Sequence, residues 1–305
     1  MTNQVWLPQN RESLSPQTLK KAQYVLDRIP QLSMSVQKII EMARDEKVDS
    51  NQLAEVASSD PVLVSKILMM VNSTYYGITH KIDNLRLAIV LLGFNEVRNI
   101  AVQFGIMTAF GKAVEEGAYD AKKLWGHSYL VSVCAEMMSG DDNPKRAGVL
   151  MTMGILHDIG KFALNSIAEM MEKKSGKKVG NIETPNDTPL LAKEENIFGL
   201  NHAIIGSMLA EKWNLSDRMC DIIEYHHFPS FFGINDIKSK YIEDISAICL
   251  ADLIVNTIMD EEKGLRKPHP VFFETLGIEP PLENLITEKT RTKLSKAEEV
   301  IESLL

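Results

Sequence analysis

The amino-acid sequence predicts an all-α protein, and three observations support this. Apolar residues recur at the spacing of three and four that places them on one face of a helix. Residues that favour helix starts precede several of these stretches, and no alternating apolar and polar run clearly indicates a strand. With 45% hydrophobic and 24% charged residues, the 305-residue chain has the composition of a folded globular protein rather than of a disordered or fibrous one. We therefore expect a multi-helix bundle of two packed helical subdomains.

The first subdomain is predicted over residues 15–115. Ser15 and Pro16 suit the N-cap and the first turn of a helix. Asp49, with Gln52 three positions later, has the pattern of a capping box. Asp60 before a proline indicates another helix start. Apolar stripes accompany these signals, and they predict helices over residues 16–29, 36–43, 53–58, 61–70, 84–92 and 95–110.

The second subdomain is predicted over residues 118–260, with a C-terminal extension over 261–305. A polar, glycine-containing stretch at 111–120 separates the two subdomains. A second stretch, 175–195, is rich in Gly, Pro, Asn and Lys and is predicted to be a loop. Helices are expected around residues 122–139, 145–157, 162–174, 202–213, 216–227 and 242–259, with a terminal one near 282–304.

Charge and composition argue against several classes of function. The 41 acidic residues outnumber the 33 basic ones, which gives a net charge of −8 and disfavours a nucleic-acid or acidic-lipid surface. Neither a membrane span nor a secretory signal is expected, because no 18 apolar residues run together. The three cysteines are far apart and form no CxxC pair. We therefore expect a reduced, cytoplasmic protein without a disulfide or thiolate–zinc scaffold.

The histidines of the second half predict a metal site. For any single buried histidine, a core side chain bonded to a carbonyl is the commoner explanation. A buried carboxylate, however, is costly unless something compensates its charge. Mutual compensation through a shared cation explains the whole set economically. Five histidines and two aspartates are predicted to point inward from successive helical segments: His127, His157, Asp158, His202, His226, His227 and Asp252.

The types of these side chains narrow the metal and its chemistry. Imidazole and carboxylate without thiolate suit Fe, Mn, Ni, Zn or Mg. Seven candidates exceed the four ligands of a structural zinc and suffice for one or two divalent ions, with Asp158 as the natural bridge. Lys161 follows His157 by four residues, where it would neutralise a phosphoryl oxygen or pair with a carboxylate. Asp158 and Lys161 are therefore the candidate catalytic residues. The chain has no P-loop, GxGxxG or GxSxG motif.

The motif His157-Asp158-Ile159-Gly160-Lys161 resembles the HD superfamily of metal-dependent phosphohydrolases, and the fit is closer to its HDOD branch. The resemblance covers roughly residues 29–252, and it implies an all-helical fold with an HD-like C-terminal subdomain and a bacterial signalling or regulatory role. We expect Asn72, Ser73 and Tyr75 to order the turn after the Asp60 helix rather than to contact a partner. The segments that carry the HDOD resemblance are Ile29–Pro30 with Leu32, Ser59–Asp60–Pro61 with Leu63, Asn72–Ser73 with Tyr75 and Tyr76, Ile82 with Leu85, Leu91–Leu92–Gly93 with Arg98, and Trp125, His127 and Ser128.

The seven inward residues also match ligand positions of the related GYP-type cyclic-dinucleotide phosphodiesterases, which bind two metals. The chain departs from those enzymes at Lys123, where some carry an acidic ligand, and at Phe228–Pro229, where the Gly-Tyr-Pro segment is missing. The resemblance therefore favours metal binding and argues against cleavage of cyclic-di-GMP.

Two functions follow as expectations from these residues and this resemblance. The first is a regulatory module with a His/Asp metal site, whose partner is a signalling protein or a small nucleotide. The alternative is an active phosphohydrolase or phosphodiesterase for a nucleotide-type phosphate ester. In the alternative, Asp158 is shared between one ion at His127, His157 and Asp252 and a second ion at His202, His226 and His227. No nucleic-acid or membrane partner is expected, and the sequence leaves the oligomeric state open.

Overall fold

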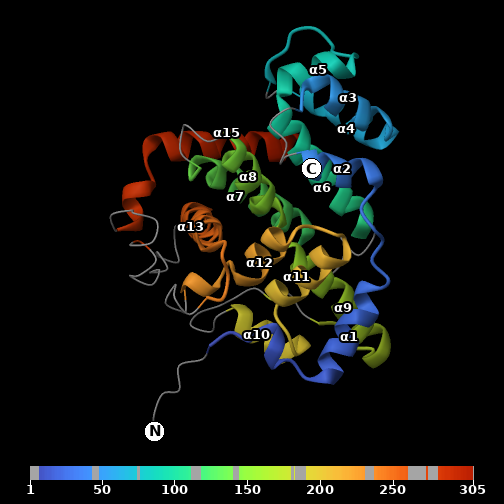
Figure 1. The fold of residues 1–305 in the computed structure, drawn as a ribbon, viewed down its shortest axis with the longest axis vertical. Coiled ribbons are helices and arrows are strands. Elements are labelled where there is room, and N and C mark those ends of the chain that lie inside the picture. Colours follow the sequence, from blue (N-terminus) through green and yellow to red (C-terminus); the bar gives the residue numbers. More distant parts are fainter. Residues whose placement is uncertain are drawn as a thin grey trace.

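The computed structural model confirms the all-α prediction: the residues that it describes form helices, turns and loops without a strand (Figure 1). Its hydrophobic core is one continuous cluster that runs from Leu14 to Ala297 and so joins both halves of the chain. The described residues are 7–42, 48–73, 76–110, 118–139, 144–179, 182, 190–230, 237–259, 273 and 281–304. Residues 111–117 of the predicted boundary at 111–120 lie outside this set, as do residues 180–181 and 183–189 of the predicted loop at 175–195.

The first helices follow the start signals of the sequence. A short 3-10 helix, η1 (Arg11–Ser13), precedes α1 (Pro16–Leu26), whose first turn is capped by the Ser15 side chain. Helix α1 packs on α9 (Ile159–Ser175) and α11 (His202–Lys212) of the second half. Lys212 Nζ donates to the carbonyl oxygens at the end of α1, and Trp213 Nε1 donates to the Pro30 carbonyl at 2.9 Å. The limits of the two subdomains stay a prediction. Helix α1, which was assigned to the first subdomain, packs against helices of the second.

Five helices follow, at the upper right of Figure 1, with α3, α4 and α5 above α2 and α6. Asp60 caps the fourth helix of the chain, with one carboxylate oxygen accepting from the backbone N–H groups of Val62 and Leu63 at 3.1 Å each. Its other oxygen accepts from Ser35 Oγ at 2.8 Å, which ties α4 to α2. The five helices are α2 (Met34–Met42), α3 (Ser50–Ser58), α4 (Pro61–Val71), α5 (Leu85–Leu92) and α6 (Phe94–Phe110).

Asn72 orders the turn after α4, as the sequence predicts. Its amide donates to the carbonyls of Leu68 and Ile82, both at 2.7 Å, and its side-chain oxygen accepts from the Ile82 N–H at 2.8 Å. One side chain thus satisfies both backbone groups of a residue ten positions away. Tyr75 lies outside the described residues.

The second half surrounds the histidines. Helix α7 (Ala121–Met137) packs on α8 (Pro144–Leu156), on α13 (Ile242–Met259) and on α15 (Glu288–Leu304), while α11 packs on α9 and on α12 (Asp217–Tyr225). The 3-10 helices η4 (Phe228–Ser230) and η6 (Leu282–Leu285) lie in the connections.

One predicted loop is partly wrong. Residues 190–195, assigned to the loop at 175–195, belong to helix α10 (Leu190–Phe198), which packs on α9. The short helical period after a polar stretch was too weak to reveal it.

The stretch Arg146–Ser175 is long and apolar enough, by length and composition alone, to cross a membrane. Its most apolar window is entirely buried inside the protein, which is the behaviour of core helices. It spans α8 and α9, with two turn residues between them. A cytoplasmic location stays a prediction.

Candidate metal centre

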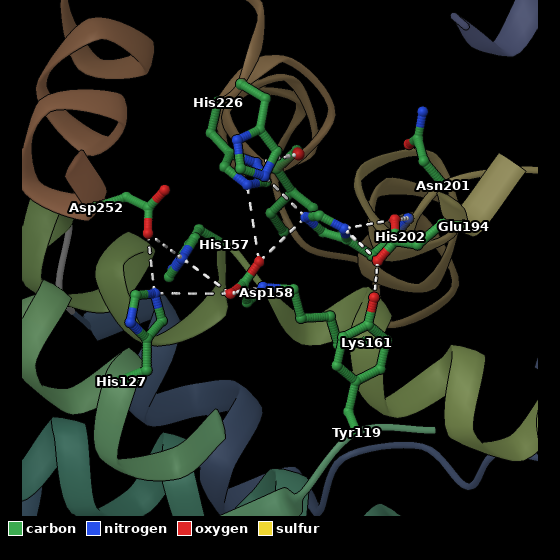
Figure 2. A network of polar contacts seen from close by, with 12 residues as sticks. Tyr119, His127, His157, Asp158, Lys161, Glu194, Asn201, His202, His226 and Asp252 are labelled. Carbon is green, nitrogen blue, oxygen red and sulfur yellow. Dashed lines mark hydrogen bonds and ion pairs between the residues drawn. The ribbon is translucent and has the colours of Figure 1, made fainter. Parts of the chain in front are cut away.

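All seven side chains that the sequence singled out lie close together in the second half, and Figure 2 labels all of them except His227. His157 and Asp158 occupy the two-residue break between α8 and α9. His202 is the first residue of α11, and His226 is the C-cap of α12 with His227 directly after it. His127 projects from α7 and Asp252 from α13. Most of the seven residues therefore lie at the ends of helices or in the break between α8 and α9.

Gly160 allows the two central helices to approach closely. A Cβ atom built on Gly160 would lie 1.8 Å from the carbonyl oxygen of His202 and 2.8 Å from the backbone nitrogen of Gly206. Only glycine fits where the backbones of α9 and α11 cross at this distance. The crossing brings Asp158, at the start of α9, to His202, at the start of α11.

Asp158 lies between two groups of side chains (Figure 2). On one side, its Oδ2 atom is 3.3 Å from His157 Nε2 and 3.7 Å from His127 Nε2. Asp252 Oδ1 completes this group, at 2.9 Å from His127 Nε2 and 3.9 Å from His157 Nε2. Two imidazoles and two carboxylates thus face each other.

The second group contains three imidazoles. Asp158 Oδ1 is 3.1 Å from His202 Nε2 and 3.8 Å from His226 Nε2. The Nε2 atoms of His202 and His227 are 3.0 Å apart. The possible ligand atoms of Asp158, His202, His226 and His227 all lie within 4.8 Å of one another, and so do those of His127, His157 and Asp158. Asp158 is the one residue common to both sets.

Two buried nitrogens show that these side chains fit a cation. The Nδ1 atom of His157 is 2.7 Å from the Gly154 carbonyl, and that of His226 is 2.8 Å from the Ile223 carbonyl. Each Nδ1 therefore carries a proton, and Nε2 points toward Asp158, where the neutral ring presents a lone pair. Neither Nε2 has a hydrogen-bond partner among the described residues. Buried polar atoms are rarely left in this state, and a metal ion accepts such lone pairs.

Comparison with known proteins shows the family to which the chain belongs. The profile of the HDOD domain family matches residues 29–229, about two thirds of the chain. The chain belongs to the HDOD domain family. Asp252, on α13, lies beyond the matched residues, so the last carboxylate of the centre comes from outside the family region.

Other HDOD and related proteins share the fold. An HDOD domain protein with unknown function from Geobacter sulfurreducens is 22% identical, with a TM-score of 0.67 over 95% of this chain and 99% of its own. A candidate phosphohydrolase from Shewanella amazonensis SB2B is 20% identical, with a TM-score of 0.62 over 93% of this chain and 98% of its own. An uncharacterized protein of Treponema pallidum (strain Nichols) is 24% identical over 260 residues, 84% of this chain and 48% of that protein. The HDOD chain thus spans about half the length of this curated relative.

The charges of the HDOD site keep its carboxylates ionised. Burial alone would raise the pKa of Asp158, but the charges of His157 and Lys161 hold it well below its ordinary value. Burial opposes ionisation of Asp252 too, and the hydrogen bond and charge of His127 lower its pKa. Ionised carboxylates are the form that binds a cation.

The imidazoles divide into two kinds. Burial disfavours the charged form of His202, but Glu194 and Asp158 outweigh it and raise the pKa to about 9. Burial and the neighbouring imidazoles act together on His226, whose pKa falls to about 3, and on His227, whose pKa falls well below its ordinary value. Two imidazoles of the three-histidine group are therefore neutral at pH 7.

Lys161 lies where the sequence places it, one turn after His157. Its Nζ atom donates to Asp158 Oδ2, and it lies 5.8 Å from the centre of the Tyr119 ring. Burial would lower the Lys161 pKa, but Asp158 and Asp252 raise it, so the side chain is an ammonium at pH 7.

Sequence reasoning missed Glu194. This residue, on α10, is completely buried. Its carboxylate accepts from His202 Nδ1 and from the Tyr119 hydroxyl. Because residues 175–195 were expected to form a loop, Glu194 was not placed on a helix. A glutamate among polar residues also gives no indication that it is buried.

Proposed function

We propose that this HDOD chain is a regulatory module that binds divalent metal in its second half. The observation that carries the proposal is the convergence of seven imidazoles and carboxylates from five separate segments, with two buried Nε2 atoms that lack a partner among the described residues. His127, His157 and Asp252 would hold one ion, and His202, His226 and His227 a second, with Asp158 shared. Such ions supply Lewis acidity. The metal identity within Fe, Mn, Ni, Zn and Mg stays open.

The regulatory role rests on membership of the HDOD family. The partner we propose is a signalling protein or a small nucleotide. The metal centre would stabilise the folded domain that binds this partner. A pair of ions holds together α7, α9, α11, α12 and α13, since each of these helices, or an end of it, carries a ligand. Metal loading would therefore rigidify the second half as a unit.

Metal content tests this proposal. Protein purified without chelator from metal-replete cells is expected to contain one or two metal ions per chain by elemental analysis. Asp158→Asn is expected to lose most of this metal, because it removes the charge shared by both groups. Glu169→Gln, which changes an exposed carboxylate on the same helix, is the matched control and should keep the metal. If the wild-type protein purified in this way contains no metal, the proposal is refuted.

A second candidate function is hydrolysis of a nucleotide-type phosphate ester. The position of Lys161 favours it, because a buried ammonium beside the shared carboxylate can neutralise a phosphoryl oxygen. The side chains of His127 and Asp252 are 19% and 10% exposed, whereas those of His157, His202 and His226 are fully buried. His227, in the other group, is partly exposed as well, so each group has a ligand that is not fully buried. The fold shared with the Shewanella protein, which is named a candidate phosphohydrolase, also supports the hydrolysis proposal.

A panel of phosphomonoesters, phosphodiesters and cyclic dinucleotides, with added Mn²⁺ or Fe²⁺, separates the two functions. Turnover that Lys161→Gln abolishes while metal content is retained would establish the hydrolase. Bound metal without turnover of any compound in the panel would leave the regulatory module. Glu169→Gln serves again as the control that should change neither quantity.

A further inference from the structure

Glu194 lies in a network of hydrogen bonds next to His202. It is fully buried, and its two oxygens receive three hydrogen-bond donors. His202 supplies two of them, the backbone N–H at 2.8 Å and Nδ1 at 2.7 Å. The hydroxyl of Tyr119 supplies the third (Figure 2). A carboxylate with this many donors is held in one orientation and stays an acceptor.

The contact dictates which nitrogen of His202 faces the centre. A carboxylate cannot donate, so Nδ1 carries a hydrogen in both the charged and the neutral ring. The nitrogen that must give up its proton to bind a metal is then Nε2, which faces Asp158 and His227 at 3.1 and 3.0 Å. His157 and His226 have their Nδ1 atoms held by neutral backbone carbonyls instead. Of these three imidazoles, only His202 is held by a charged side chain.

The charge makes His202 a stronger ligand. A hydrogen bond to a carboxylate is roughly twice as strong as one to a neutral acceptor and raises the basicity of the opposite nitrogen. The three-histidine group otherwise has a single carboxylate, the shared Asp158. Glu194 supplies a second negative charge just behind it, without itself being a ligand.

Tyr119 is held firmly enough to maintain the arrangement. Its backbone N–H donates to Asn165 Oδ1 at 2.8 Å, and its carbonyl accepts from Asn165 Nδ2 at 2.9 Å. Asn165 lies on α9, as does Lys161, which lies 5.8 Å from the Tyr119 ring centre. The same helix that presents Lys161 therefore positions the tyrosine that orients Glu194.

We infer that Glu194, oriented by Tyr119, is a positioning residue that fixes the tautomer of His202 and makes the His202–His226–His227 position the tighter of the two metal positions. This inference rests on the proposed metal binding and adds an order of affinity to it. The ion at the His127 side would then be the exchangeable one.

Zn²⁺ titration against a competing chelator tests the inference on the full chain. In the wild type, two binding steps are expected. In Glu194→Gln, the tighter step should weaken by about 10- to 100-fold, the usual effect of losing such a partner, while the weaker step stays unchanged. Tyr119→Phe, which keeps the carboxylate, should show a smaller shift of the same step. Glu195→Gln is the matched control, because Glu195 is the next residue of α10 and accepts from Gln9 and Asn201 instead.

A spectroscopic signature separates positioning from mere structural support. In the Zn²⁺-loaded wild type, the proton on His202 Nδ1 should resonate far downfield because its acceptor is charged, and Glu194→Gln should move it upfield. Equal weakening of both steps, or no weakening, would overturn the inference while leaving metal binding intact. A wild type that takes up no Zn²⁺ would overturn both. If Glu194→Gln does not fold, Tyr119→Phe carries the test, and an unchanged tight step in that variant would overturn the inference.

Discussion

Replacing Gly160 with alanine is expected to force α9 away from α11. The added Cβ would lie 1.8 Å from the carbonyl oxygen of His202, about 1.6 Å short of the 3.4 Å at which ordinary contact begins. The nearest atoms belong to the backbone of α11, which cannot turn aside as a flexible side chain would. The helices must therefore separate, and His202 must move from its position 3.1 Å from Asp158 Oδ1.

Both stability and metal affinity should fall. Overpacking a well-filled core costs about 1–3 kcal/mol, and the backbone contact at Gly160 places Gly160→Ala at about 3 kcal/mol or above. Urea denaturation of the metal-free protein measures this loss. Zn²⁺ titration should show in addition that the His202 position is weakened. The matched control is Gly126→Ala, beside His127 on α7, where the added Cβ would lie 3.6 Å from Ile301 Cγ2.

Gly126→Ala is expected to be neutral or to stabilise by up to about 1 kcal/mol, because alanine is the better helix former. If Gly160→Ala unfolds at the same urea concentration as the wild type, or no earlier than Gly126→Ala, the close crossing of α9 and α11 is wrong. The crossing would then not be what brings Asp158 to His202.

Three further predictions concern the stability of the fold. Asp60→Ala should lower the free energy of unfolding by about 1–2 kcal/mol, because it removes the cap of α4 and the link to Ser35; an unchanged urea midpoint would refute this. Burial raises the pKa of Glu96 to about 6 from an ordinary 4.5 despite the hydrogen bond from Tyr129, so the folded state prefers the protonated form and stability falls as pH rises from 4.5 through 6. Relative to the wild type, Glu96→Gln should therefore gain up to about 2 kcal/mol between pH 4 and pH 8, and a difference that does not vary with pH would contradict this. Chelation of bound metal should lower the melting temperature of the wild type but not of Asp158→Asn, since an ion bound only by the folded state stabilises it; equal shifts in calorimetry would count against the metal centre.

The helices of the first half could be read from the sequence because their signals are local. Asp49 and Gln52 form the predicted capping box in full, and Asp60 caps α4 as expected. The convergence of the histidines was also accessible, since residues on the apolar face of a helix must point to the common core. The sequence does not show which of these residues lie within a few ångströms of one another, because those distances depend on tertiary packing.

Three features could not be predicted because they depend on how the helices pack together. An amphipathic stripe shows that α1 buries one face, but not that this face packs on α9 and α11 rather than on α2–α6. Gly160 reads as an ordinary helical glycine until the crossing helix is known. Glu194 becomes a buried partner of His202 only when α10 is packed on α9.

Anomalous diffraction from crystals grown with Mn²⁺ or Zn²⁺ is the sharpest test of the metal centre. We predict two anomalous peaks about 3.5–4 Å apart, one on each side of the Asp158 carboxylate, with His202, His226 and His227 around one and His127, His157 and Asp252 around the other. Absence of any peak within reach of Asp158, with the metal found elsewhere or not at all, would contradict it.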